Sequence, residues 1–108
     1  MRIMLKSKLS GLKVTDASLH YEGSITLDPK LMREADILEY EQVHVLNVSN
    51  GKRFVTYAIA GEEAEVCVNG AASHLVDIGD EIMVLAYTIS NGSSVYGTYG
   101  KPRIIKCG

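Results

Sequence analysis

The chain has 108 residues, with 11 Lys and Arg against 13 Asp and Glu, and a formal net charge of −2. This length predicts one compact domain, 1–108, because domains typically contain roughly 50 to 250 residues. A chain of this size buries only about 65% of its unfolded surface, so we expect a second subunit to complete any deep active site. The balanced charge argues against nucleic acid as a partner, since phosphate-binding surfaces are basic.

Cysteine usage and hydropathy narrow the class of protein further. Cys67 and Cys107 are the only cysteines, and no Cys-x-x-Cys or His-rich spacing accompanies them, which predicts free thiols and no metal site. The first residues, MRIMLKSKLSG, contain Arg2, Lys6 and Lys8 and so lack the continuous apolar core of a signal peptide. No apolar stretch is long enough to span a bilayer. We therefore expect a cytoplasmic protein without membrane contact.

The first predicted element is a strand from Ile3 to Thr15. Apolar residues alternate with polar ones up to Leu9, and the apolar positions then shift parity to Leu12 and Val14. A β-bulge at Gly11 accounts for the shift.

A short strand and a helix follow. Ser24 to Leu27 is predicted to be a strand because its residues favour extended structure. Asp28-Pro29 is a helix N-cap followed by a proline in the first helical position, which predicts a helix from there to about Asp36.

The second half of the chain is predicted to be mostly β. Residues 42–48 and 52–60 form a hairpin around Asn50-Gly51, a strong signal for a tight turn. The remaining predicted elements are a strand over 65–68, one or two helical turns over 71–76, a strand over 81–89 and a loop over 90–100. Six or so short strands with two brief helices indicate an all-β protein built as a small closed or nearly closed barrel.

The stretch HYEGSITLD places Gly23 and Ser24 directly before a predicted strand. A serine hydroxyl can attack the preceding carbonyl and exchange an amide for an ester where glycine lets the backbone twist. The ester is ordinarily less stable, so the fold must supply strain and a donor for the developing oxyanion. An ordinary turn is the alternative interpretation, because Gly-Ser pairs are commonplace.

The hairpin's return strand, NGKRFVTYAIA, carries a second group of candidates. Arg53, Val55 and Tyr57 share one face by period two, whereas Thr56 points the other way. Arg53 offers a cation that can hold a carboxylate, and Tyr57 offers a phenol that can deliver a proton. The alternative interpretation is that Arg53 is a solvated surface residue and Tyr57 is part of the barrel wall. Lys8, taken by itself, is predicted to be a surface charge.

A third candidate is the stretch VNGAASH. Asn69-Gly70, followed by Ala71 and Ala72, leaves backbone N–H groups uncovered by large side chains. Such a loop entering a helix can bind a carboxylate or phosphate through those donors. A plain turn at a helix start is the alternative.

Four segments together resemble the aspartate 1-decarboxylase family: KSKL, HYEGSITLD, NVSNGKRFVTYAIAG and VCVNGAASHLVDIGDEI. The resemblance runs from about Met4 to Tyr87. It implies a bacterial pyruvoyl-dependent enzyme that makes β-alanine for pantothenate synthesis. It also implies a six-stranded double-psi β-barrel assembled as a homotetramer, with active sites between subunits. Ser10 departs from the family, whose members often have histidine at this position.

The resemblance implies that the chain cleaves itself between Gly23 and Ser24, into a β-chain, 1–23, and an α-chain, 24–108. Ser24 attacks the Gly23 carbonyl, the ester eliminates to dehydroalanine, and hydrolysis with loss of ammonia leaves a pyruvoyl group. Thr56 matches the residue that assists this cleavage. The resemblance leaves open whether cleavage is spontaneous or needs a maturation factor as a partner.

The same resemblance implies how L-aspartate would be decarboxylated. The pyruvoyl group, a covalent cofactor made from Ser24, forms a Schiff base with the substrate amine and accepts the electron pair released with CO2. Tyr57 matches the family's proton donor. Substrate-binding residues are matched by Lys8, Arg53, Thr56, Gly70, Ala71 and Ala72. Aspartate has two carboxylates, and the resemblance leaves open which cation binds which.

Two other functions compete with this one. A pyruvoyl decarboxylase could act on another amino acid, such as histidine or arginine. A non-enzymatic β-barrel could instead serve as a DNA-binding or adaptor module. A binding module predicts an unbroken backbone before Ser24, so the intact mass separates it from either enzyme.

Overall fold

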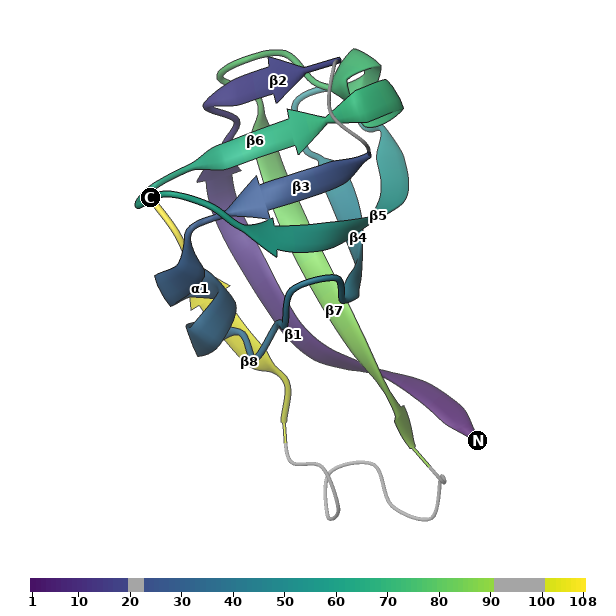
Figure 1. Cartoon of the computed structure of the whole chain (residues 1–108). Helices are drawn as coiled ribbons and strands as arrows, with labels where there is room; N and C mark the ends of the chain where they lie inside the picture. Colours follow the sequence, from purple (N-terminus) through teal and green to yellow (C-terminus); the bar gives the residue numbers. More distant parts are fainter. Residues whose placement is uncertain (20–22, 91–100) are drawn as a thin grey trace.

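A computed structural model describes residues 1–19, 23–90 and 101–108. The predicted loop over 90–100 therefore lies outside the described residues, apart from Ser90. The elements, in chain order, are β1 (Arg2–Lys13), β2 (Asp16–Ser18), β3 (Ser24–Leu27), α1 (Pro29–Glu34), β4 (Gln42–Asn47), β5 (Arg53–Ala60), β6 (Val66–Asn69), the 3-10 helix η1 (Gly70–Leu75), β7 (Glu81–Ser90) and β8 (Arg103–Lys106) (Figure 1).

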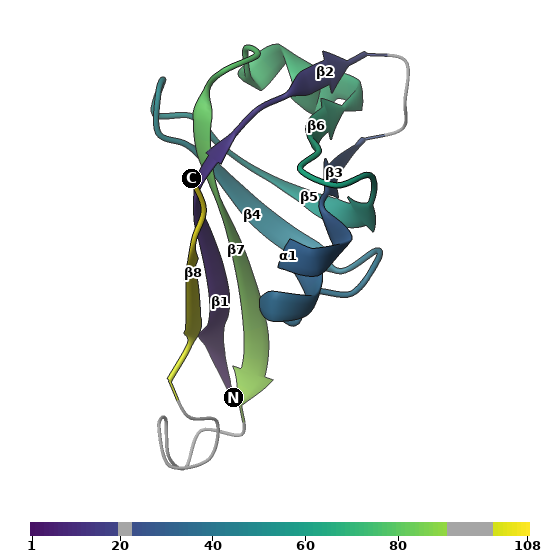
Figure 2. The same cartoon turned by 90° about the vertical axis from the view of Figure 1, so that its left-hand side faces the viewer.

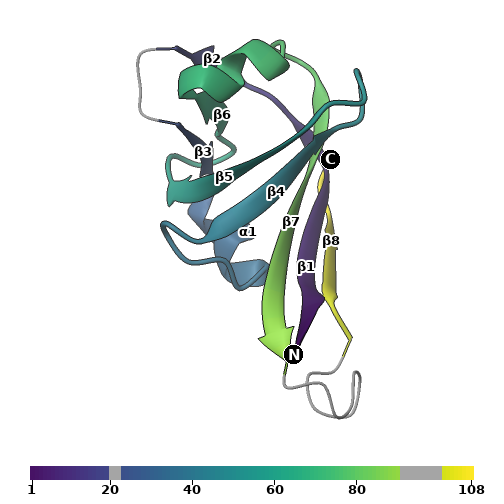
Figure 3. The same ribbon diagram turned by 90° about the vertical axis from the view of Figure 1, so that its right-hand side faces the viewer.

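The strands form one curved, mixed sheet of 8 described strands in the order β2-β6-β3-β5-β4-β7-β1-β8. Strand β3 lies between β6 and β5, antiparallel to the first and parallel to the second. The long strands β1 and β7 run side by side and extend beyond the rest of the molecule toward the N-terminus (Figures 1 and 3). At the opposite end, β2, β6 and η1 gather above β3 (Figure 2).

Every predicted strand is present within a residue or two of its expected bounds, but β2 and β8 were not expected. They are only 3 and 4 residues long, and each pairs in parallel with a strand distant in the sequence. Such short segments are too brief for alternation of apolar and polar residues to be recognised. Long-range pairing therefore defines them.

Strand β1 contains the predicted bulge. Its register against β7 shifts between Leu9 and Leu12, and Gly11 there has φ +79°. A Cβ at this glycine would collide with the backbone carbonyl of Cys107, so both the conformation and the space require glycine. A second shift, between Leu5 and Ser7, was not predicted.

Local signals explain the helix and the hairpin. The Asp28 carboxylate accepts a hydrogen bond of 2.8 Å from the Lys30 N–H, and proline occupies the first turn, as predicted. Helix α1 ends at Glu34, slightly before the expected Asp36. Gly51 takes a φ of +78° in the hairpin turn between β4 and β5.

The apolar core lies inside the curve of the sheet. Strand β4 alternates strictly and buries Val43 and Val45 completely. Strands β3 and β6 differ, because all four residues of each are buried. Polar side chains on β3 and β6 are therefore withdrawn from solvent and need hydrogen-bond partners within the protein.

Candidate active site

Ser24, the predicted nucleophile, is the first residue of β3 and is only 2% exposed. The preceding Gly23 is exposed, and a side chain added there would meet no atom of the described residues within 4 Å. The bond between them thus joins an exposed residue to a buried one. Neither crowding nor a left-handed φ requires glycine at position 23 in this conformation.

Asn69 is the direct partner of Ser24. The two residues are register partners on the antiparallel strands β6 and β3. The Asn69 Nδ2 group donates to the Ser24 hydroxyl at 2.9 Å and to the Thr26 hydroxyl at 2.9 Å. Asn69 also stands at the N-cap of η1, yet its side chain makes no cap hydrogen bond. Its side-chain amide bonds to Ser24 instead.

Cys67 completes this buried polar cluster. Its thiol donates to the Asn69 Oδ1 at 3.1 Å. Burial raises the pKa of the Cys67 thiol, and the nearby carboxylates of Asp16 and Glu65 raise it further. The sulfur therefore keeps its proton at neutral pH. Neither of the two cysteines forms a disulfide, as the sequence predicted.

We call Ser24, Thr26, Cys67 and Asn69 the Asn69 cluster. A cavity of about 350 Å³ opens beside it, lined by Asp16, Ser18, Thr26, Ile59, Glu65, Cys67 and Asn69. From the sequence, Asn69 was predicted only as part of a turn, and its contact with Ser24 was not predicted. The missing information is the register of β6 against β3, which joins residues 45 positions apart.

Tyr57 lies on the other side of β3 from Asn69. Ile25 of β3 is the register partner of Ala58 on the parallel strand β5. Ser24 and Tyr57 directly precede these two residues, so they lie at the same level of the two strands. The structure thus brings Ser24 between the strand that carries Asn69 and the strand that carries Tyr57.

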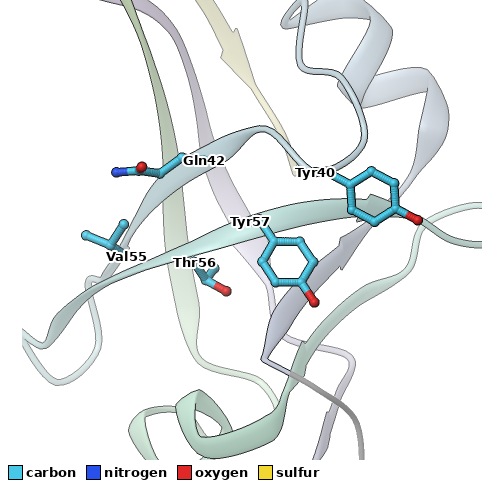
Figure 4. A pocket seen from close by; sticks show the side chains of 5 residues that line it. All are labelled: Tyr40, Gln42, Val55, Thr56 and Tyr57. Atoms are coloured by element: carbon cyan, nitrogen blue, oxygen red, sulfur yellow. The ribbon is translucent and has the colours of Figure 1, made fainter.

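Tyr57 and Thr56 line a second pocket, of about 440 Å³, together with Tyr40, Gln42 and Val55. Figure 4 shows the hydroxyl groups of Tyr40, Thr56 and Tyr57 toward one end of it, with Gln42 and Val55 toward the other. The rings of Tyr40 and Tyr57 lie 6.1 Å apart between centroids. This is within the range of aromatic contact.

The predicted division of β5 into two faces is confirmed. Tyr57 pairs with the exposed Gln42, whereas Thr56 pairs with the fully buried Val43. Paired residues share a face of the sheet, so Thr56 stands on the core side of the strand. Arg53 shares the face of Tyr57 but is exposed and lies about 13 Å further along the strand.

Lys8 is not brought to Ser24 within one chain. It pairs with Leu85, which pairs with His44, which pairs with Val55 of β5. Counted along the curved sheet, Lys8 is therefore three strands from β5, a path of about 14 Å at roughly 4.8 Å for each strand. The adjacent Leu9 is fully buried, so Lys8 lies on the outer face of the barrel.

The small-residue segment follows Asn69 directly and forms η1, close to the predicted helical turns. Gly70 is buried with φ +72°, Ala71 is exposed, and Ala72 packs partly against the core. This segment therefore begins beside the Asn69 cluster.

In the described part of the chain, no group of three or more His, Cys, Asp and Glu side chains could hold a metal ion. No helix among these residues is both long and apolar enough to cross a membrane.

Solved structures support the fold. A rationally designed protein, mkDPBB_sym_86, covers 74% of this chain and 95% of its own, with a TM-score of 0.51 at 15% sequence identity. This likeness shows the double-psi β-barrel that the sequence resemblance implied.

Sequence comparison gives the family. Residues 1–107 match the aspartate decarboxylase family. Aspartate 1-decarboxylase from Kosmotoga olearia is 49% identical over 97% of this chain and 90% of its own length. The enzyme of the same name from Thermoanaerobacter pseudethanolicus is 48% identical over 96% and 89%. The chain therefore belongs to the aspartate decarboxylase family.

Proposed function

We propose that the protein decarboxylates L-aspartate to β-alanine and CO2, after it has cleaved itself at Gly23–Ser24 and turned Ser24 into a pyruvoyl group. The names of its relatives support the substrate and the reaction. The observation that carries the self-cleavage is the buried Ser24 hydroxyl, held by Asn69 at 2.9 Å directly after an exposed glycine.

The cleavage uses groups of the chain, and water enters only in the last step. The Ser24 Oγ bonds to the Gly23 carbonyl carbon, the C–N bond breaks, and the Ser24 nitrogen takes up the hydroxyl proton. Loss of the Ser24 α-proton then breaks the bond between Cβ and Oγ, releasing the Gly23 carboxylate and leaving dehydroalanine. Water converts this residue to the pyruvoyl group and ammonia.

Two neighbours support the first step. The Asn69 N–H holds the Ser24 hydroxyl and stabilises negative charge as it develops on the oxygen. Thr56, one strand away from Ser24, would donate to the oxyanion on the Gly23 carbonyl. Its place on the core side of β5 means that this contact requires the backbone at position 23 to turn inward.

The residues around position 24 fit the implied group. A ketone oxygen accepts a hydrogen bond from the Asn69 Nδ2 as a hydroxyl does, and the cluster contains no ionised side chain that would oppose it. When bound, the group supplies an electrophilic carbonyl for the substrate amine and accepts the electrons released with CO2. Ser24 itself is buried, which limits competing water at this position.

The remaining roles fall to residues from several elements. Tyr57 would protonate the substrate carbon that loses CO2. Arg53 and Lys8 would hold the substrate carboxylates, and N–H groups of Gly70, Ala71 and Ala72 would contact the substrate. Because Lys8 is three strands from β5 on the outer face, we propose that it acts in the active site of a neighbouring copy, within a homotetramer.

Denaturing mass spectrometry tests the proposal directly. We expect the purified wild-type chain to separate into residues 1–23 and 24–108, the larger fragment carrying a carbonyl in place of the serine amine. Ser24→Ala should stay intact and inactive, because alanine has no oxygen with which to attack. An active wild-type protein with an unbroken backbone contradicts the proposal.

Tyr57→Phe separates the two stages of the chemistry. We expect this variant to cleave as the wild type does but to lose most of its turnover, since proton delivery contributes about 10²- to 10⁴-fold. Release of CO2 from aspartate, histidine and arginine measures the turnover and the substrate choice together. Unchanged turnover rejects the role of Tyr57, and faster release from histidine or arginine favours the competing pyruvoyl enzyme.

A further inference from the structure

We propose that Cys67 is a positioning residue for self-cleavage, because its thiol donates to the Asn69 Oδ1 and thereby directs the Asn69 Nδ2 toward Ser24. The inference rests on the proposed function. Its basis is the closed set of contacts in the Asn69 cluster, where both Nδ2 hydrogens and the Oδ1 have partners.

The register of the strands explains why these side chains meet. Asn69 is opposite Ser24 and Cys67 is opposite Thr26 on the antiparallel pair β6 and β3. Residues two apart on a strand share a face, so all four side chains lie on the same face of the sheet. All four are buried, at 8% exposure or less. Their polar groups therefore bond mainly to one another.

The orientation of the Asn69 amide decides what Ser24 receives. With Nδ2 toward β3, Ser24 accepts a hydrogen bond and keeps its own proton free for transfer to a base. With the amide turned over, Oδ1 would face the two hydroxyls, and Ser24 would have to donate its proton to Asn69. In this turned orientation, the Asn69 Oδ1 holds the Ser24 hydroxyl proton, which the attack must release. The Ser24 oxygen also loses the hydrogen bond from the Asn69 Nδ2.

Cys67 distinguishes these two orientations. A protonated thiol donates to Oδ1, but it is only a weak acceptor for Nδ2. Burial, together with the negative charges of Asp16 and Glu65, raises the pKa of Cys67 and keeps its proton in place. The Cys67 thiol therefore favours the orientation that supports attack by Ser24.

Three substitutions at position 67 separate hydrogen bonding from packing. Cys67→Ser retains a donor, Cys67→Ala removes it, and Cys67→Val removes it while filling the space. We expect cleavage of Cys67→Ala and Cys67→Val to be about fivefold to tenfold slower, the value of one neutral hydrogen bond. Cys67→Ser keeps a donor for Oδ1, but its hydroxyl can also accept from Nδ2, so we expect a cleavage rate between those of the wild type and Cys67→Ala. Cys107→Ala is the matched control, because its thiol is also partly buried but lies outside the cluster.

A second measurement reports the amide itself. In the uncut Ser24→Ala background, NMR follows solvent exchange of the Asn69 side-chain protons, assigned by their loss in Asn69→Asp. We expect exchange to quicken when Cys67→Ala is added and to stay slow with Cys67→Ser. Melting temperatures in the same background show whether any variant is simply unfolded.

The outcomes are decisive in either direction. Slow cleavage of the Ala and Val variants, with rescue by Ser, supports the role. Wild-type cleavage in all three, or equally slow cleavage in the Ser variant, overturns it. A wild-type chain that never cleaves removes the proposed function and the cleavage role together, while unchanged amide exchange in Cys67→Ala removes only the orienting role of Cys67.

Discussion

Two buried asparagines, Asn47 and Asn69, are 1% and 3% exposed but are used in opposite ways. The Asn47 Nδ2 group donates to the Leu75 carbonyl at 3.1 Å and to the Asp80 carboxylate at 2.8 Å. Its Oδ1 accepts from the backbone N–H groups of Ser49 and Asn50. Asn47 therefore ties together the turn after β4 and the segment before β7.

Asn69 instead contacts three side chains, none of them charged, and one is the hydroxyl of Ser24. The contrast shows that burial of an amide does not by itself indicate function. An amide that satisfies backbone groups stabilises loops. An amide whose partners are hydroxyls and a thiol holds groups that can react, which is why the Asn69 cluster carries the proposed chemistry.

The largest expected effect is on the rate of cleavage in Asn69→Ala. Asn69 donates to the attacking oxygen, and a hydrogen bond to a group that becomes charged contributes about 1.5–3 kcal/mol. We therefore expect cleavage to slow by about 10- to 10²-fold. The fraction of intact chain against time, read by denaturing gel or mass, measures the rate. Rapid cleavage of a folded Asn69→Ala chain would exclude Asn69 from the mechanism. Neither asparagine would then have a role in cleavage.

Asn47→Ala should lower the stability of the fold and leave the rate of cleavage nearly unchanged. Removing this side chain takes away one of the two hydrogen bonds of the Asp80 carboxylate. It also removes the acceptor of the Ser49 and Asn50 N–H groups, and we expect the free energy of unfolding to fall by about 2–3 kcal/mol. Urea unfolding of the uncut Ser24→Ala form measures it. Cleavage of folded Asn47→Ala, with Ser24 restored, should stay within about threefold of the wild type. Slow cleavage of Asn47→Ala at unchanged stability would contradict the purely structural role of Asn47.

The smallest expected effect is a difference in acid sensitivity. The Asn47 side chain, followed by the Asp77 N–H, holds the pKa of Asp80 below its ordinary value. A carboxyl group with a lowered folded pKa stabilises the fold above its unfolded pKa, about 3.9, and loses this contribution as pH falls through the folded pKa. Hydrogen bonds from Ala64 and Lys30 lower the pKa of Asp28 in the same way.

Melting temperatures of the uncut form between pH 7 and pH 2.5 test this difference. The wild type should lose stability below about pH 4, and Asn47→Ala should lose less over that interval because its Asp80 titrates nearer the ordinary value. Asn69→Ala should keep the full acid dependence, since the Asn69 cluster holds no carboxylate. Equal acid dependence in both variants would show that Asn47 does not control Asp80.

Much of the framework follows from local patterns. The bulge at Gly11, the helix start at Asp28, the hairpin at Gly51 and the shared face of Arg53 and Tyr57 were all predicted. Each depends on backbone preferences or on period two, and these are properties of neighbouring residues. The family resemblance added candidate roles for side chains, which stay predictions until the variants are measured.

The rest depended on long-range pairing, which alternation does not encode. The strands β2 and β8, the contact between Asn69 and Ser24, and the position of Lys8 three strands from β5 all depend on which segments become neighbours and in what register. A shift of one residue in β6 would turn Asn69 to the opposite face. The amino-acid sequence thus indicated the candidate reactive group, and the tertiary structure decided which side chains surround it, because packing of the whole barrel sets the register of its strands.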